Sequence, residues 1–137
     1  MSDFRVRMYA DSLRRYTSYR TFGLQISAEN TGIMGLSMGG FGAIHTALAY
    51  PDRFGKIGAM SSALIVHEVA GILARKAKMP EIYMCCGTED GLLETNRVFD
   101  RFLTSRGVDH IYLETKGFHD MDFWNEYTLK IIPWMFG

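Results

Sequence analysis

The stretch that most constrains the fold of this chain runs from Thr31 to Gly42 and reads TGIMGLSMGGFG. It opens with a short apolar run of strand type, and the helix-forming segment Phe41–Tyr50 follows it. Between the two, residues 35–39 match G-x-S-x-G, the pattern of a nucleophile elbow, in which a serine stands on a sharp turn from a strand to a helix. The pattern predicts that the hydroxyl of Ser37 is exposed at the end of a strand.

The turn itself predicts what surrounds this serine. A tight strand-to-helix turn leaves little room for side chains, which accounts for Gly35 and Gly39 on either side. The helix that follows presents free backbone N–H groups and the positive end of its dipole, so we expect the N–H of Met38 to stabilise an oxyanion formed at Ser37. The alternative is a glycine-rich turn whose serine only caps the helix.

The composition indicates one globular domain spanning residues 1–137. Hydrophobic residues make up 47% of the chain, and 15 Lys and Arg residues balance 15 Asp and Glu residues, which argues against a nucleic-acid partner. No apolar run reaches the roughly 20 residues of a membrane span and no secretory signal opens the chain, so we expect a cytoplasmic protein with no membrane partner. Cys85 and Cys86 are adjacent, and we expect reduced core thiols.

Strand and helix patterns alternate along the chain. The segment Ser2–Arg20 has apolar residues at roughly helical spacing and is predicted to be an amphipathic helix. The patterns further predict strands at Thr31–Leu36, Lys56–Ser61, Glu81–Cys86 and His110–Thr115, and helices at Phe41–Tyr50, Ala63–Lys78, Gly91–Arg106 and Asp122–Phe136. The last helix is apolar nearly all round, so we expect it to be buried on more than one side. The alternation predicts an α/β fold with about four parallel strands and right-handed crossover helices.

Ligands of such sheets bind at the carboxyl ends of the strands, so any partner of Ser37 should directly follow a strand. Asp90 follows the third predicted strand, and His119 follows the fourth. The chain order serine, aspartate, histidine is that of the α/β-hydrolases. Acyl transfer needs a base that takes the serine proton, so His119 is the predicted general base and Asp90 the acid that orients its ring.

Other acids and histidines are weaker candidates. Glu89 is the rival acid, and Asp120 and Asp122 stand too close to His119 in sequence. The remaining histidines, expected to lie on the surface or in ordinary hydrogen bonds, are His45, His67 and His110. No Cys and His spacing fits a metal site and no phosphate-binding loop is present, so we expect neither a metal nor another cofactor.

Four motifs together resemble one known family. They are GLSMGGFGA at 35–43, YPDRF at 50–54, CGTED at 86–90 and GFHDMDFW at 117–124. In combination they resemble the esterase D and tributyrin-esterase group. That group is the α/β-hydrolase branch that includes S-formylglutathione hydrolases and feruloyl- or acetyl-ester hydrolases.

The resemblance implies Ser37 as nucleophile, Asp90 as acid, His119 as base and the Met38 N–H as one oxyanion donor. It implies a serine carboxylesterase that hydrolyses small esters of short-chain acids through an acyl-enzyme, without a cofactor. A thioester hydrolase of the S-formylglutathione type is a second possibility. A non-catalytic hydrolase domain that serves as an assembly module is a third.

The resemblance covers only the C-terminal half of the family's fold, from about Thr31 onward. We therefore expect a reduced α/β-hydrolase fold that lacks the usual N-terminal strands and the loop that supplies the second oxyanion donor. Weak activity would follow from the incomplete oxyanion hole. The strand before Ser37 would become an apolar sheet edge, so we expect a homodimer or higher oligomer that pairs through this edge.

Overall fold

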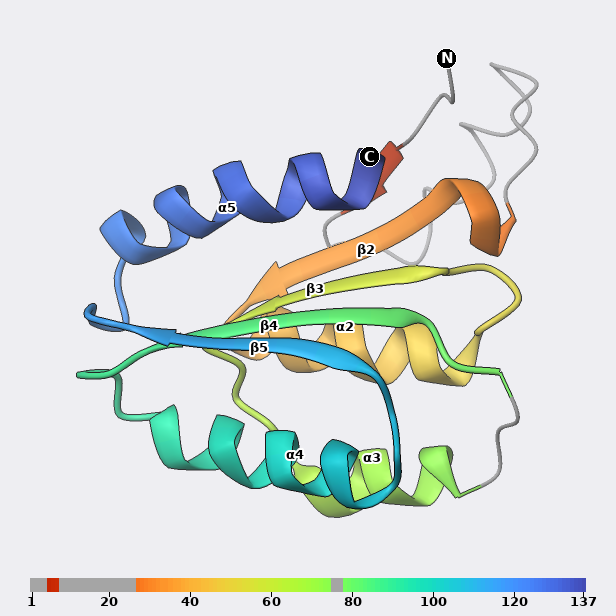
Figure 1. The fold of residues 1–137 in the computed structure, drawn as a ribbon, viewed down its shortest axis with the longest axis horizontal. Coiled ribbons are helices and arrows are strands. Elements are labelled where there is room, and N and C mark those ends of the chain that lie inside the picture. Colours follow the sequence, from red (N-terminus) through yellow and green to blue (C-terminus); the bar gives the residue numbers. More distant parts are fainter. Residues whose placement is uncertain (1–4, 8–26, 75–77) are drawn as a thin grey trace.

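Five parallel strands form the sheet of the computed structural model, which describes residues 5–7, 27–74 and 78–137 (Figure 1). The strands lie side by side in chain order: β1 (Arg5–Arg7), β2 (Thr31–Leu36), β3 (Lys56–Met60), β4 (Glu81–Gly87) and β5 (His110–Thr115). All four pairings are parallel. Parallel neighbours need a crossover connection, and from β2 onward a helix supplies each one.

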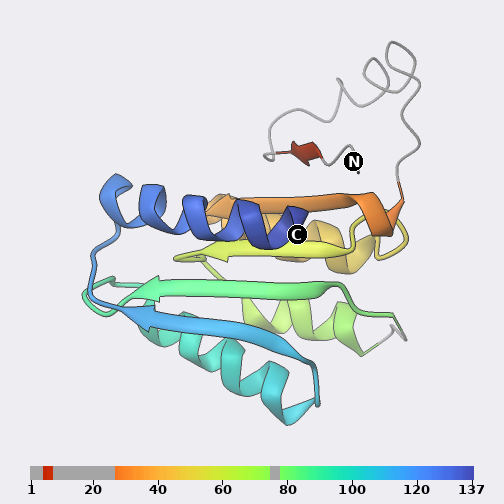
Figure 2. The same cartoon turned by 45° about the horizontal axis from the view of Figure 1, so that its top comes forward.

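Helices cover both faces of the sheet. A short 3-10 helix, η1 (Ala28–Asn30), precedes β2, and the longer helices are α2 (Met38–Ala49), α3 (Val66–Leu73), α4 (Leu93–Ser105) and α5 (Met121–Phe136). Figures 1 and 2 show α2, α3 and α4 on one face and α5 on the other. None of these described helices is long and apolar enough to cross a membrane.

Successive strand residues point to opposite faces of the sheet and pack into two separate hydrophobic cores, one on each face. The core under α2, α3 and α4 is built on Ile33, Ile57, Ile82 and Met84, together with Ile44, Leu48, Val69, Phe99 and Leu103 of the helices. The core under α5 contains Met34, Met60, Tyr83 and Cys85 of the strands and Phe123, Tyr127, Ile131 and Met135 of the helix. A Cβ on Gly58 would lie 2.5 Å from Cγ2 of Ile131, so glycine at this position lets α5 lie close to β3.

The α/β class, the parallel sheet and the order of strands and helices from residue 31 onward are confirmed. Both cysteines are buried and free, as expected. The helix predicted over Ser2–Arg20 is wrong at Arg5–Arg7, which form β1, and the rest of that segment lies outside the described residues.

The last helix also differs from its prediction, because α5 is buried along one face. The buried residues recur every fourth position, at Phe123, Tyr127, Ile131 and Met135. Between them Leu129 is 75% exposed. Trp124, Ile132 and Trp134 are partly buried against the same core, so the helix packs through one broad face and leaves Leu129 outside it.

The edge of the sheet also differs from its prediction. β1 pairs with β2 from Thr31 to Ile33, so β2 is not an open edge along its whole length. Residues 34–36 lie beyond the stretch of β2 that pairs with β1.

Candidate active site

Ser37 stands between β2 and α2 with φ 51° and ψ −122°, a backbone conformation that a residue with a side chain rarely adopts. Such a conformation costs about 1–3 kcal/mol and persists where surrounding bonds fix it. Here the Ser37 N–H donates to the Met60 carbonyl at 2.9 Å, and the Ser37 carbonyl accepts from the N–H of Ala63 at 3.0 Å. The serine side chain makes no capping hydrogen bond to α2, which removes the reading of Ser37 as a helix cap.

At two positions of the turn a side chain would clash with neighbouring atoms, so only glycine fits there. A Cβ on Gly35 would lie 2.3 Å from the carbonyl oxygen of Gly39, and a Cβ on Gly40 would lie 2.2 Å from Oγ of Ser62. Gly39 faces open space, so the expectation that crowding requires glycine there is wrong. That Gly40 must be glycine was not predicted from the sequence, although the pair of glycines after Met38 is a signal for it.

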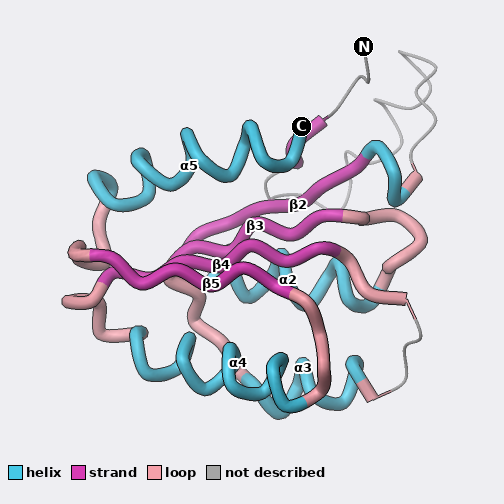
Figure 3. Tube along the Cα trace, in the orientation of Figure 1, coloured by secondary structure: helices cyan, strands magenta, loops and turns pink. Residues whose placement is uncertain are grey.

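The predicted serine, histidine and aspartate meet at the carboxyl ends of the strands. Nε2 of His119 lies 3.0 Å from Oγ of Ser37, and Nδ1 of His119 lies 2.8 Å from Oδ2 of Asp90. An aspartate that is ionised can only accept, so Nδ1 carries the ring proton and Nε2 of the neutral ring accepts from the serine hydroxyl. Figure 3 shows the loops after β4 and β5, which carry Asp90 and His119, at the same end of the sheet.

The carboxylate of Asp90 is held ionised although its side chain is fully buried. Burial raises the pKa of this carboxyl, but hydrogen bonds to the charged form outweigh burial and leave the pKa below its ordinary value. The Leu92 N–H donates to Oδ1 at 2.8 Å, and His119 donates to Oδ2. Ser61 also favours the charged form, although its buried hydroxyl has no well-aligned hydrogen-bond partner among the described residues.

His119 is packed on one side and open on the other. Its ring meets the ring of Trp124 nearly at right angles, at 87° and with 4.8 Å between centroids. The next residue, Asp120, caps α5 by accepting from the N–H of Phe123 at 3.0 Å, which fixes the backbone beside the histidine. The His119 side chain stays 35% exposed, so a small molecule can reach it from solvent.

The rival candidates lie elsewhere. The Glu89 side chain is exposed, Asp120 serves as the cap of α5, and Asp122 is exposed in the first turn of that helix. The other histidines are engaged or on the surface: His45 contacts Phe41, His67 is exposed, and His110 bonds Asp100 and the Val108 carbonyl. In the described residues no such side chain reaches Ser37.

The surface around Ser37 is open and apolar. Met38, Phe118 and Met121 are 73%, 56% and 57% exposed, and each lies within two residues of Ser37 or His119 in the chain. Met38 is also the first residue of α2, so its N–H has no partner within the helix. An anion bound at Ser37 would find this donor beside it.

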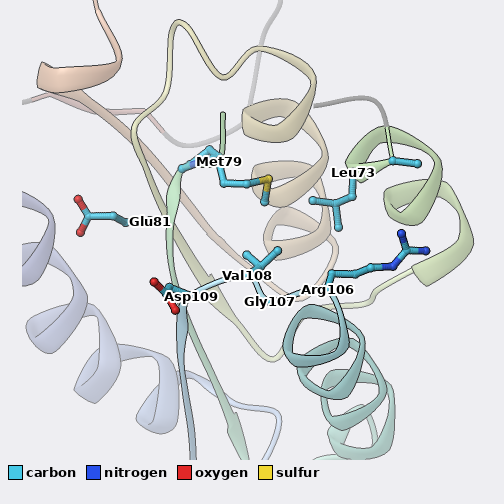
Figure 4. A pocket seen from close by; sticks show the side chains of 9 residues that line it. Leu73, Met79, Glu81, Arg106, Gly107, Val108 and Asp109 are labelled. Carbon is cyan, nitrogen blue, oxygen red and sulfur yellow. The ribbon is translucent and has the colours of Figure 1, made fainter. Parts of the chain in front are cut away.

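A separate hollow of about 580 Å³ lies at the opposite end of the sheet (Figure 4). It is lined by residues from the ends of α3 and α4 and the starts of β4 and β5, among them Leu73, Met79, Glu81, Arg106 and Val108. The amino ends of parallel strands are not where ligands of such sheets bind. The triad of side chains at the carboxyl ends is therefore the better candidate for chemistry.

Comparison with known proteins gives several matches. Residues 20–134 match the family model described as "Putative esterase". The chain is 35% identical to the acetyl esterase of Caldicellulosiruptor saccharolyticus, covering 83% of this chain and 57% of that relative. It is 24% identical to the uncharacterized protein YbbA of Bacillus subtilis (strain 168), covering 80% and 50%.

Solved structures agree with this fold. The S-formylglutathione hydrolase FrmB of Staphylococcus aureus has a TM-score of 0.78 at 24% identity, covering 89% of this chain and 57% of that one. The fluorophosphonate-binding serine hydrolase FphF of the same organism has a TM-score of 0.80 at 23% identity, covering 91% and 62%.

The matches differ in extent. This chain spans about half the length of the curated relatives it matches. The alignment with the acetyl esterase extends over 152 residues, more than the 137 of this chain, so that relative carries residues inside the matched region that have no counterpart here. Because the family model matches most of the chain, this protein belongs to the esterase family, with the fold of the α/β-hydrolases.

Proposed function

We propose that this chain is a serine carboxylesterase that hydrolyses short-chain acyl esters. The observation that carries the proposal is the continuous path from Oγ of Ser37 through the ring of His119 to the buried carboxylate of Asp90, with bonds of 3.0 and 2.8 Å. The name of the acetyl esterase, 35% identical over most of this chain, supports an acyl ester as substrate.

The geometry fits acylation by a serine. Oγ of Ser37 attacks the ester carbonyl while Nε2 of His119 takes the hydroxyl proton. The ring then gives that proton to the departing alcohol, which leaves an acyl-enzyme on Ser37. A water molecule, activated by the same nitrogen, attacks this ester and releases the acid. Throughout, Asp90 holds the ring in the required tautomer and stabilises its charged form.

The oxyanion of each tetrahedral intermediate would lie at the start of α2, where the Met38 N–H can donate to it. We assign this one donor among the described residues. A missing oxyanion donor costs about 10²–10³ in rate, whereas loss of the serine itself costs about 10⁶. Because the first cost is much smaller than the second, we expect slow but measurable hydrolysis of activated esters.

The proposed substrate range follows from the surface of the site. Exposed Met38, Phe118 and Met121 offer apolar contact without enclosing an acyl chain. Short acyl groups with little selectivity among alcohols fit such a surface best.

The test is hydrolysis of p-nitrophenyl acetate and butyrate by the purified chain. Ser37→Ala and His119→Ala should each abolish the activity, and His45→Ala, a change further along helix α2, should retain it. Activity that survives in Ser37→Ala would overturn the proposal, and inactivity of the unmodified chain would favour the assembly module. Comparing kcat/KM for S-formylglutathione with kcat/KM for a phenyl ester separates a thioester hydrolase from an esterase.

We further propose that the protein is a homodimer or higher oligomer that pairs through the β2 edge at residues 34–36. Among the described residues β1 pairs with the first half of this edge only, so the second half is where we place a strand of a second copy. Size-exclusion chromatography with light scattering tests this proposal, and a clean monomer at micromolar concentration would contradict it.

A cytoplasmic location is the remaining part of the proposal. The buried, unpaired thiols of Cys85 and Cys86 support a reducing compartment. Fractionation of cells that produce the protein should recover it with cytoplasmic markers, and recovery outside the cytoplasm would contradict this part.

A further inference from the structure

Asn96 is a fully buried polar residue near the start of α4, and its side chain joins two loops. Its Oδ1 accepts from the N–H of Ser62 at 3.2 Å, while its Nδ2 donates to the Ser62 carbonyl at 3.0 Å and to the Leu92 carbonyl at 2.9 Å. Only an amide side chain can accept and donate in this way without charge. Reversing the amide would place its oxygen against two carbonyls, so the orientation is fixed.

The first loop holds the serine. Ser62 lies between the two residues that bond the backbone of Ser37, because Met60 accepts from the Ser37 N–H and Ala63 donates to the Ser37 carbonyl. The same loop presses on the first turn of α2, since a Cβ on Gly40 would lie 2.2 Å from Oγ of Ser62. Moving Ser62 would therefore move Ser37.

The second loop holds the aspartate. The N–H of Leu92 donates to Oδ1 of Asp90 at 2.8 Å, and the carbonyl of the same residue accepts from Nδ2 of Asn96. One residue thus orients the Asp90 carboxylate through its N–H and is tied to Asn96 through its carbonyl.

We propose that Asn96 is a positioning residue that sets the distance between Ser37 and Asp90, an inference that rests on the proposed esterase function. The ring of His119 must reach Oγ of Ser37 and Oδ2 of Asp90 at once, at 3.0 and 2.8 Å. A misplacement of about 1 Å in such an arrangement can lower a rate 10²-fold. Asn96 touches neither the ring nor the reacting atoms in the described bonds, so it acts through the two loops.

Asn96→Ser is the informative variant. A serine in this helix can still bond the carbonyl of Leu92 one turn back, but it is too short to reach Ser62. The hydrogen bonds to Ser62 are then lost, whereas the hydrogen bond to Leu92 at the start of α4 is retained. Leu103→Ala is the matched control, since Leu103 is equally buried in α4 and packs in the core away from both loops.

Two readouts on the full chain test the inference. In ester hydrolysis, Asn96→Ser should lower kcat about 10–100-fold with little change in KM, whereas Leu103→Ala should lower thermal stability and keep kcat. In proton NMR without substrate, the low-field signal of the Nδ1 proton of His119 should persist in Leu103→Ala and shift or disappear in Asn96→Ser.

The two readouts also separate this inference from the proposed function. If the unmodified chain shows no hydrolysis, the esterase proposal fails, and the NMR signal still reports whether Asn96 positions the Asp90 and His119 pair. Unchanged kcat and an unchanged His119 signal in Asn96→Ser would overturn the inference. If Asn96→Ser does not fold, Asn96→Asp takes its place, since it keeps the size of the side chain but loses the donor. A lower kcat and a changed His119 signal would then support the inference, and unchanged values of both would overturn it.

Discussion

Gly35 and Gly39 lie in contact across the turn that carries Ser37, because a Cβ on Gly35 would come within 2.3 Å of the Gly39 carbonyl oxygen. The end of β2 and the first turn of α2 therefore meet backbone to backbone. A side chain on Gly35 must displace one of them, and the serine stands between. Gly39 itself has no neighbour within 4 Å of its own missing Cβ.

We predict opposite effects of alanine at these two glycines. Gly35→Ala should lower the free energy of unfolding by about 1–3 kcal/mol through overpacking and should reduce ester hydrolysis. Gly39→Ala should leave the stability unchanged or raise it by up to about 1 kcal/mol, because glycine is unfavourable inside a helix. Urea denaturation of the two variants measures the change in unfolding free energy that each substitution causes. Equal destabilisation by the two substitutions would contradict the packing described at this turn.

The one-sided burial of α5 gives a second prediction. Ile131 is fully buried against Gly58 and the strands, while Leu129, two residues earlier, is 75% exposed. Ile131→Ala should cost about 2–5 kcal/mol of unfolding free energy, and Leu129→Ala should cost less than about 0.5 kcal/mol. Thermal or urea denaturation checks the pair. A large loss in Leu129→Ala would mean that the outer face of α5 is covered in solution.

The buried carboxylate of Asp90 gives a third prediction, on the dependence of stability on pH. Its pKa lies below the ordinary value of 3.8 in the folded chain, so its ionised form stabilises the fold above that pH. This contribution is lost as pH falls from about 4 toward the lower pKa of the folded state. Asp90→Asn lacks the contribution, so the difference in unfolding free energy between the unmodified chain and this variant should shrink from pH 6 to pH 3. A difference that grows over this range would contradict the ionised Asp90.

Local sequence patterns were sufficient for the central elements. The strands Thr31–Leu36 and His110–Thr115 match their predicted bounds because apolar and β-branched residues stand between turn-forming neighbours. The partners of Ser37 could be predicted because parallel strands bring their carboxyl ends to one side of the sheet, and Asp90 and His119 each follow a strand by a few residues.

The missed features depend on contacts between distant segments. Arg5–Arg7 lie in a segment with helical spacing, yet they pair with β2, and pairing between distant strands leaves no local signal. Asn96 stands in an amphipathic helix where a polar residue suggests the solvent side. Its burial follows from bonds to Ser62, 34 residues away, and to Leu92. Leu129 is apolar, but only the placement of α5 on the sheet determines that it faces outward.

The central claim is that His119 activates Ser37, and covalent labelling tests it most directly. A fluorophosphonate reacts with an activated serine, and mass spectrometry of the digested chain locates the adduct. We predict one adduct, on the peptide that contains Ser37, with labelling lost in His119→Ala and retained in His45→Ala. No adduct on Ser37, or equal labelling of Ser37 in His119→Ala, would contradict the account.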